Sequence, residues 1–178
     1  QGLDTTSLQA DLSVMDILMD AGASLSQLDG DTGNITAQRA PLKAFSVDAS
    51  NCPDLFPIIS VLAAFCQGTS RLAGVGRLAN KESDRAKAIL EMLTQMGVKA
   101  SIEGDEMVIE GHTLTHRLLT GNMLKGGAYT SHHDHRMVMA LKVASLGTDS
   151  PVTIDDEACV SKSFPDFQQT FETVASSD

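Results

Sequence analysis

The sequence has no tryptophan and one tyrosine, and aromatic residues make up only 4% of its 178 residues. Leucine, isoleucine, valine, methionine and alanine must therefore fill the core. Hydrophobic residues make up 42% and charged residues 20% of the chain, which excludes the polar composition of a disordered protein. The length suits one domain, or one lobe of something larger, with a sizeable core.

Positive charge is scarce as well. Lys and Arg number 13 against 23 Asp and Glu, so the formal net charge is −10 and the pI is about 4.8. This balance argues against a nucleic-acid or anionic-membrane surface, but not against a local basic site for a small anion. The longest apolar run, Leu55–Cys66, is too short to span a bilayer, and no signal peptide is recognisable. We expect no nucleic-acid partner and no membrane partner.

Cysteine is limited to Cys52, Cys66 and Cys159, an odd number without a C-x-x-C motif. This excludes a disulfide scaffold and a structural zinc site, and it favours a reducing compartment such as the cytoplasm. The chain begins at Gln1 without an initiator methionine. We therefore expect either processing or a piece of a longer protein.

An internal similarity is present at an offset of 80 residues. Asp54 falls on Asp134, and the apolar run Leu55–Cys66 falls on His135–Leu146 without a gap. Each copy reads as strand, polar loop, aspartate, helix, turn, strand, loop, charged residue and helix. This pattern predicts an α/β (α+β) architecture of repeated β-α-β-α-β-β units.

The single elements follow from hydrophobic periodicity and turn residues. The run Leu55–Cys66 is apolar on all sides, which indicates a helix buried between layers. A second helix is predicted over Ser83–Met96, with Gly97 as its stop. Strands are predicted around Val47, over Arg71–Val75, and in a hairpin of Val98–Ile102 with Met107–Ile109.

We expect a single lobe over residues 1–178, with units of about 1–45, 46–126 and 127–178. The first unit holds only a helix, marked by Leu8 to Met19, and a hairpin that ends near Ile35. The last unit ends after its second helix, without a closing hairpin. This interruption predicts that the chain belongs to a larger repeating fold.

The start of the helix after Asn80 carries charges on two faces. Glu82 and Arg85 extend the buried stripe of the helix, whereas Asp84, Lys87 and Glu91 lie on the opposite, solvated face. Two interpretations are equally supported by this spacing. Glu82 and Arg85 form an ion pair at (i, i+3), or the helix start lines a cleft in which Arg85 and backbone N–H groups bind an anion.

A second charged cluster, His132 to Arg136, directly precedes another helix. Asp134 is a natural N-cap. The cluster partly matches the H-x-H-x-D-H motif of lactamase-type metallo-hydrolases, but Thr130 replaces the first histidine and leaves His132, Asp134 and His135 as ligands. In the alternative interpretation, the histidines and the guanidinium of Arg136 hold a phosphate or a carboxylate.

Lys162 occupies the repeat position of Glu82. If the loops converge, two carboxylates serve as general base and general acid, and cationic side chains neutralise phosphate and carboxylate groups. This chemistry suits group transfer between small, multiply charged anions. The expected site consists of Asp54, Lys81, Glu82, Arg85, His135, Arg136 and Lys162.

Four short motifs together resemble the C-terminal motifs of the 5-enolpyruvylshikimate-3-phosphate (EPSP) synthase family. They occur in the family's order and at plausible separations, and the resemblance covers nearly the whole chain. The motifs are Pro53-Asp54, Lys81–Arg85, Asp134–Met137 and Lys162–Pro165. The resemblance implies one lobe of a two-lobed enolpyruvyl transferase fold, with the active site between the lobes and one unit incomplete.

The resemblance also implies a reaction. The family transfers the enolpyruvyl group of phosphoenolpyruvate to the 5-hydroxyl of shikimate 3-phosphate, and it needs no metal or organic cofactor. By motif position, Asp54 is implied as the base near the hydroxyl, Glu82 as the group that exchanges a proton with the methylene carbon, and Lys81 as a contact of shikimate 3-phosphate. The residues implied around phosphoenolpyruvate are Arg85, His135, Arg136 and Lys162, and Lys162 is also counted with the catalytic residues.

The chain corresponds to only the later half of the family sequence. The implied partners are the two substrates and the missing N-terminal lobe. We expect the full-length protein to be a monomer and this fragment alone to show little turnover. Arg77 stands where some members have a substrate-contacting asparagine, so that role is not carried over. Three alternatives stay open: an enolpyruvyl transferase for UDP-N-acetylglucosamine, against which the Lys81–Arg85 motif argues, a non-catalytic anion-binding module, and a metallo-hydrolase.

Overall fold

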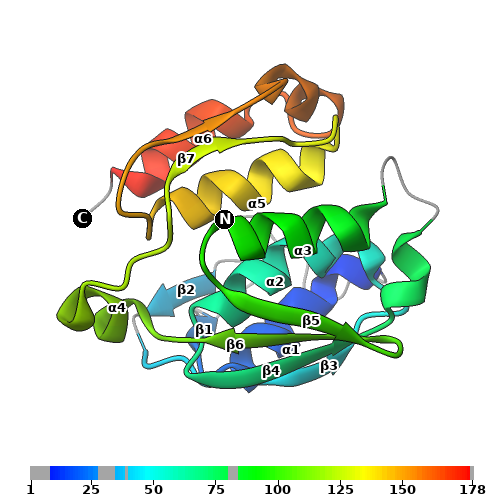
Figure 1. Cartoon of the computed structure of the whole chain (residues 1–178), viewed down its shortest axis with the longest axis vertical. Coiled ribbons are helices and arrows are strands. Elements are labelled where there is room, and N and C mark those ends of the chain that lie inside the picture. Colours follow the sequence, from blue (N-terminus) through cyan, green and yellow to red (C-terminus); the bar gives the residue numbers. More distant parts are fainter. Residues whose placement is uncertain (1–8, 28–34, 39, 80–83, 177–178) are drawn as a thin grey trace.

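The computed structural model is a mixed α/β chain, and it describes residues 9–27, 35–38, 40–79 and 84–176 (Figure 1). Its α-helices are α1 (Ser13–Asp20), α2 (Phe56–Ala64), α3 (Arg85–Gln95), α4 (Leu114–Thr120), α5 (His135–Ser145) and α6 (Phe167–Ala175). Four 3-10 turns are η1 (Ala10–Leu12), η2 (Pro53–Leu55), η3 (Val75–Leu78) and η4 (Glu157–Lys162). The strands are β1 (Ser24–Gln27), β2 (Ile35–Gln38), β3 (Ser46–Asp48), β4 (Gly68–Ala73), β5 (Lys99–Glu103), β6 (Glu106–Gly111), β7 (Gly127–Tyr129) and β8 (Val152–Ile154).

Three small sheets organise these strands. The four-stranded sheet has the order β3-β4-β6-β5, in which β3 and β4 are parallel and β6 is antiparallel to both of its neighbours. The hairpin expected around Gly104 is confirmed, because β5 and β6 pair with Glu103 opposite Glu106. The other two sheets are the antiparallel pair β1-β2 and the parallel pair β7-β8.

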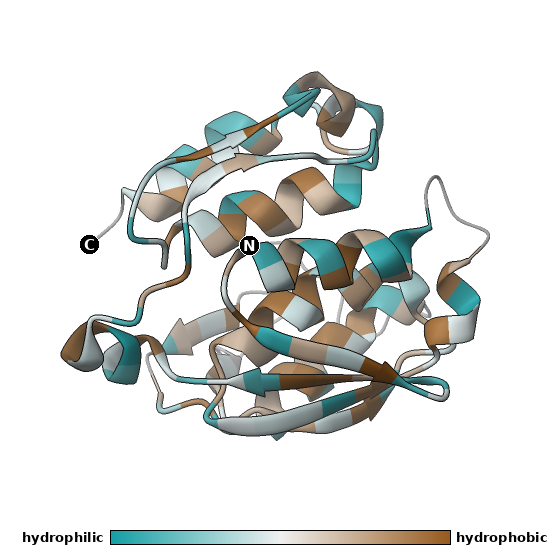
Figure 2. Ribbon diagram, in the orientation of Figure 1, coloured by the Kyte–Doolittle hydropathy of each residue, from teal (hydrophilic) through white to brown (hydrophobic). Residues whose placement is uncertain are grey.

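The buried helix predicted over Leu55–Cys66 is confirmed as η2 and α2. Seven of the nine residues of α2 are buried, and its prolines lie in its first turn and in η2. The one polar side chain inside it, Ser60, donates a hydrogen bond to the Phe56 carbonyl at 2.7 Å, so it adds no unpaired group to the core. Helix α2 packs against α5 and against the four-stranded sheet. Buried apolar residues of these elements belong to one core cluster, and Figure 2 shows where apolar residues lie along the ribbon.

The strand predicted over Arg71–Val75 corresponds to β4, which begins earlier, at Gly68, and ends earlier, at Ala73. It stops at Ala73 because Gly74 has a φ of +103°, which turns the chain into η3. A side chain could not replace this glycine, because a Cβ there would lie 2.7 Å from the backbone nitrogen of Ser50.

Two strand-helix-strand segments, β3-α2-β4 and β7-α5-β8, have the same parallel topology. Ser46 pairs with Arg71 and Gly127 pairs with Val152, so the strands correspond at an offset of 81 residues, not 80. The aspartates at the helix starts keep the offset of 80, because the loop before α5 is one residue shorter. Within the described residues β8 pairs only with β7, whereas β4 has β6 on its second edge. The division into units stays a proposal that these topologies favour.

Helix α4 lies in a segment for which no element was expected. Thr113 caps its start by accepting a hydrogen bond from the His116 amide, and Gly121, with a φ of +68°, ends it. Its buried Arg117 donates to the carbonyls of Ala64 and Asn122 at 3.0 Å each. Burial lowers the pKa of Arg117, whose hydrogen bonds to backbone oxygens fix α4 to the end of α2. No helix in the described ranges is long and apolar enough to cross a membrane.

Candidate active site

The N-terminal ends of α2, α3 and α5 meet at one end of the molecule, on the right in Figure 1. Arg85, the first residue of α3, joins them through its side chain. Its Nη1 lies 2.7 Å from Asp54 Oδ1 at the start of α2, and its Nε lies 2.8 Å from Asp134 Oδ2 at the start of α5. These contacts bring together three helix starts whose convergence the sequence analysis posed only as a condition.

Arg85 is only 2% exposed, although it carries a full charge. Burial opposes that charge, but the hydrogen bonds to Asp134 and Asp54 outweigh it and raise the pKa of Arg85 above its usual value. The prediction that Arg85 lies on the buried stripe of α3 is confirmed, as is the exposure of Asp84, Lys87 and Glu91 on its other face. Glu82 and Lys81 lie outside the described residues, so their predicted roles stay predictions.

Asp134 is fully buried and uses both carboxylate oxygens. Oδ1 accepts a hydrogen bond from the Arg136 amide at 2.9 Å, which makes Asp134 the expected N-cap of α5. Oδ2 accepts the bond from Arg85. The sequence indicated the capping role and, in the metal interpretation, a ligand role. In the internal repeat Asp134 aligns with Asp54, and this alignment was the signal that Asp134 also belongs to the site.

The guanidinium of Arg136 lies between two carboxylates. Nη2 is 3.4 Å from Asp54 Oδ2, and Nη1 is 3.4 Å from Asp11 Oδ2. Its side chain is 28% exposed, so it is open to a ligand on one side. Asp11, in η1, is a residue that the sequence reasoning missed, since an acid before an amphipathic helix is ordinary. Asp54 thus contacts both guanidinium groups of the site.

His135 and Lys162 occupy neighbouring elements. His135 is the partly buried first residue of α5, directly after the Asp134 cap. Lys162 is the exposed last residue of η4, which packs on α5. Lys162 makes no ion pair with the part of the chain that the structure describes. The structure therefore joins Asp54, Arg85 and Arg136 directly, and it places His135 and Lys162 on elements packed beside them.

Two of the three ligands of the alternative metal site, His132 and Asp134, contact other partners. His132 Nε2 lies 3.5 Å from Glu91 Oε2, and both oxygens of Asp134 are occupied as described. Among the described residues, no group of three or more His, Cys, Asp or Glu side chains is arranged to hold a metal ion. The geometry favours the anion interpretation of this cluster over the metal interpretation.

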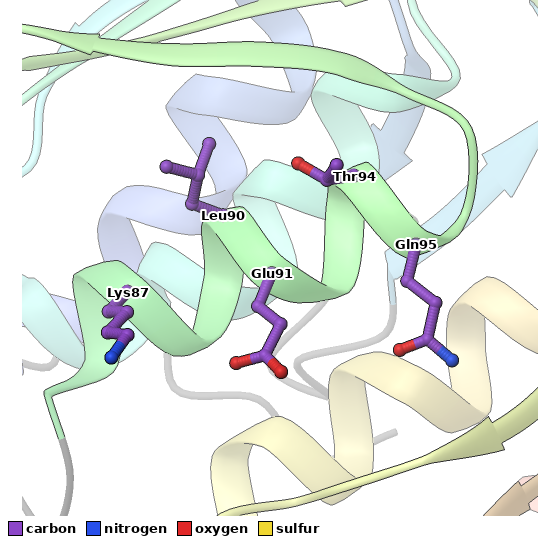
Figure 3. Close-up of a pocket in the computed structure, with 5 residues that line it drawn as sticks. All are labelled: Lys87, Leu90, Glu91, Thr94 and Gln95. Carbon is purple, nitrogen blue, oxygen red and sulfur yellow. The ribbon is translucent and has the colours of Figure 1, made fainter.

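A shallow hollow of about 540 Å³ lies along α3, and two of its side chains, Glu91 and Gln95, point toward α5 (Figure 3). Its lining consists of Lys87, Leu90, Glu91, Thr94 and Gln95. These side chains form the solvated face that the helical periodicity predicts, and none of them belongs to the four sequence motifs. The hollow thus contains no residue of the expected site, although its Glu91 lies 3.5 Å from His132.

Comparison with known proteins places this arrangement in a family. The family model described as EPSP synthase (3-phosphoshikimate 1-carboxyvinyltransferase) matches residues 1–171. The 3-phosphoshikimate 1-carboxyvinyltransferase of Brachyspira hyodysenteriae is 39% identical over 174 residues, which are 97% of this chain and 39% of that protein. The chain thus spans about two fifths of the length of this relative.

Solved structures agree with the sequence comparison. The EPSP synthase of Acinetobacter baumannii superposes with a TM-score of 0.75 at 28% identity, over 98% of this chain and 40% of that chain. The enolpyruvyl transferase NikO of Streptomyces tendae gives a TM-score of 0.65 at 15% identity, over 90% of this chain and 34% of that chain, and shows the fold alone. The predicted enolpyruvyl transferase fold is confirmed, and the chain matches only a part of each structure.

Proposed function

Because the chain belongs to the EPSP synthase family, we propose that the protein containing it transfers the enolpyruvyl group of phosphoenolpyruvate to the 5-hydroxyl of shikimate 3-phosphate. The observation that carries the proposal is the contact of Arg85 and Arg136 with Asp54 where three helix starts meet. Two guanidinium groups suit the phosphate and carboxylate of phosphoenolpyruvate. A carboxylate between them suits a base for the attacking hydroxyl.

In this mechanism each residue has one task. Asp54 accepts the proton of the 5-hydroxyl while the oxygen bonds to the central carbon of phosphoenolpyruvate. Glu82 donates a proton to the methylene carbon, which gives a tetrahedral intermediate. Phosphate then leaves and takes the proton held by Asp54, and a methyl proton returns to Glu82 as the double bond forms again, so both carboxyl groups end as they began. Positive charge from Arg85, Arg136 and Lys162, together with hydrogen bonding by the His135 imidazole, stabilises the charge of phosphate and carboxylate throughout, and Lys81 contacts shikimate 3-phosphate.

We propose that a second lobe, upstream in the full-length protein, completes the site. The chain spans 39% of its Brachyspira relative, and both described arginines of the site are already paired with carboxylates of this lobe. Further cations are needed to bind two multiply charged substrates tightly. The chain alone is therefore expected to show little turnover. The complete protein is proposed to be a cytoplasmic monomer in which glyphosate competes for the phosphoenolpyruvate subsite.

Phosphate release tests the reaction. Full-length protein is incubated with phosphoenolpyruvate and shikimate 3-phosphate, and E82Q is compared with E172Q, which changes an exposed glutamate of α6. E82Q is expected to lose turnover while it retains substrate binding, and E172Q to behave as wild type. Unchanged turnover of E82Q contradicts the catalytic role of Glu82.

Turnover, substrate binding and zinc content of the full-length protein separate the alternatives. Turnover with UDP-N-acetylglucosamine in place of shikimate 3-phosphate indicates the other enolpyruvyl transferase. Binding of both substrates without phosphate release indicates a non-catalytic anion-binding module. Stoichiometric zinc in the purified protein, lost when His132 and His135 are replaced, indicates the metallo-hydrolase.

A further inference from the structure

The two loops that follow β7 and β8 lie side by side, because these strands are parallel neighbours. The first loop leads into α5 and so positions His135 and Arg136. The second leads into η4 and so positions Lys162. The relative placement of these three side chains therefore depends on how the two loops are joined.

One connection joins the buried Ser131 to the exposed Asp155. Ser131, with no exposed surface, donates hydrogen bonds from its amide and its hydroxyl to Asp155 Oδ1 at 2.6 and 2.8 Å. The hydroxyl also lies 3.2 Å from the Asp155 carbonyl oxygen. The hydrogen bond from the backbone N–H of Ser131 is the main cause that lowers the pKa of Asp155. This carboxylate therefore stays ionised and accepts the hydrogen bonds.

The second connection joins two residues with unusual backbone conformations. His133 Nδ1 lies 2.6 Å from Asp156 Oδ2. His133 has a φ of +58° and Asp156 a φ of +42°, and with His132 they are the three non-glycine residues of positive φ in the described chain. Residues with a Cβ enter this region reluctantly, so contacts must hold both loops in it. The strained conformations and the contact between them occur together.

The loop after β8 leads into η4, so its position determines where Lys162 lies at the end of that turn. Cys159 and Val160 of η4 are buried against Val138 of α5. Lys142 Nζ of α5 also lies 3.0 Å from Glu157 Oε2. These contacts hold Glu157, Cys159 and Val160 on α5, and Asp156 directly precedes the turn that ends at Lys162, so the Asp156 contact sets where this turn begins.

We propose that Ser131, His133, Asp155 and Asp156 form a β7–β8 clamp that positions Lys162 relative to His135 and Arg136 for binding the anionic groups of phosphoenolpyruvate. These four are positioning residues, since they act through the cations that contact the substrate. The inference rests on the proposed enolpyruvyl transfer and names a further set of residues on which that site depends.

The kinetic test uses the full-length protein with H133G, D156G and the double variant. Glycine adopts both positive φ values without strain, so these variants delete the contact and are expected to keep the fold. The KM for phosphoenolpyruvate is expected to rise about threefold in each single variant, while the KM for shikimate 3-phosphate and the Tm stay unchanged. The double variant should be no worse than either single variant, because both lose the same contact.

Controls separate the contact from general loop loosening. D156N tolerates the left-handed backbone and still accepts a hydrogen bond, so it is expected to keep the wild-type KM. H116A and D20A remove exposed side chains of the same types outside the site and should have no effect. The clamp would be overturned if D156N raised the KM for phosphoenolpyruvate as much as D156G does. It would also be overturned if the two single effects on this KM added up in the double variant, or if the KM for shikimate 3-phosphate rose equally.

Amide hydrogen exchange gives a readout that is independent of activity. Residues 157–162 of the full-length protein are expected to exchange faster in H133G and D156G than in wild type and D156N. If wild type releases no phosphate, the proposed function fails, and the exchange comparison still decides on the clamp. Unchanged exchange in both glycine variants contradicts the clamp whatever the activity.

Discussion

Arg85 Nε and Asp134 Oδ2 lie 2.8 Å apart, although 49 positions separate the two residues in the sequence. The Arg85 side chain is 2% exposed and that of Asp134 is not exposed at all. A buried pair of this kind gives little net stability by itself, but removing one partner leaves an uncompensated charge in the interior. The pair therefore makes the fold of the lobe depend on a residue of its candidate active site.

R85M tests this dependence. The substitution leaves Asp134 buried without its guanidinium partner, so the free energy of unfolding is expected to fall by roughly 3–5 kcal/mol. K87M, on the exposed face of the same helix, should change it by less than about 0.5 kcal/mol. Urea unfolding of both variants measures the difference. Equal midpoints for R85M and wild type would contradict the structural role of the pair.

D11N tests how Arg136 is held. Asp11 Oδ2 is one of the two carboxylate oxygens beside the Arg136 guanidinium, and Asp54 supplies the other. With Asp11 neutral, the guanidinium is less restrained, and the KM of the full-length protein for phosphoenolpyruvate is expected to rise about two- to fivefold. D16N, an exposed acid on α1, is the matched control. A phosphoenolpyruvate KM equal to that of D16N would show that Asp11 does not restrain Arg136.

Asp149 gives a pH dependence of stability. Hydrogen bonds from the Gly126 amide, Lys125 and Ser150 lower its pKa from 3.8 to about 2. Because the folded pKa is depressed, its contribution is fully present above the unfolded pKa and is lost as the pH falls through about 2. The Tm of wild type should therefore fall more steeply than that of D149N between about pH 5 and about pH 2. Parallel curves would contradict this assignment.

Arg117 is predicted to stabilise the lobe without affecting catalysis. R117A removes the donors to the carbonyls of Ala64, His112 and Asn122, which lie within α2 or beside α4. The expected loss is about 2–4 kcal/mol of unfolding free energy, with unchanged KM values. R71A, which removes an exposed arginine of β4 paired with the exposed Glu103 and Glu106, serves as the control in both measurements. A stability equal to that of R71A would contradict the role.

Much of the fold follows from periodicity. The wholly apolar run that became α2 and the stripe that includes Arg85 on α3 were visible because burial imposes a 3.6-residue period. Helix α4 was missed, because its leucines are largely exposed and its buried face consists of an arginine bound to backbone oxygens. A hydrophobic pattern does not report burial of that kind.

The site was predictable to the extent that its residues share short motifs. Asp54, Arg85 and Arg136 stand in such motifs and meet in the structure. The partner of Arg136 in η1, Asp11, comes from 125 positions earlier in the chain, and no local pattern marks it. The repeat was recognisable, but the predicted offset of 80 residues is one too small for the strands, which correspond at 81. A comparison without gaps cannot detect that the loop before α5 is one residue shorter.

The two buried helices, α2 and α5, run in the same direction. Their starts meet at Asp54 and Arg136, and their ends meet where a Cβ on Gly147 would overlap the Phe65 ring. Their peptide dipoles are therefore aligned, with the positive ends at the candidate active site and the negative end of α2 against the Arg117 guanidinium. The backbone thus adds a positive potential to the site that no side-chain substitution removes, in a chain whose net charge is −10.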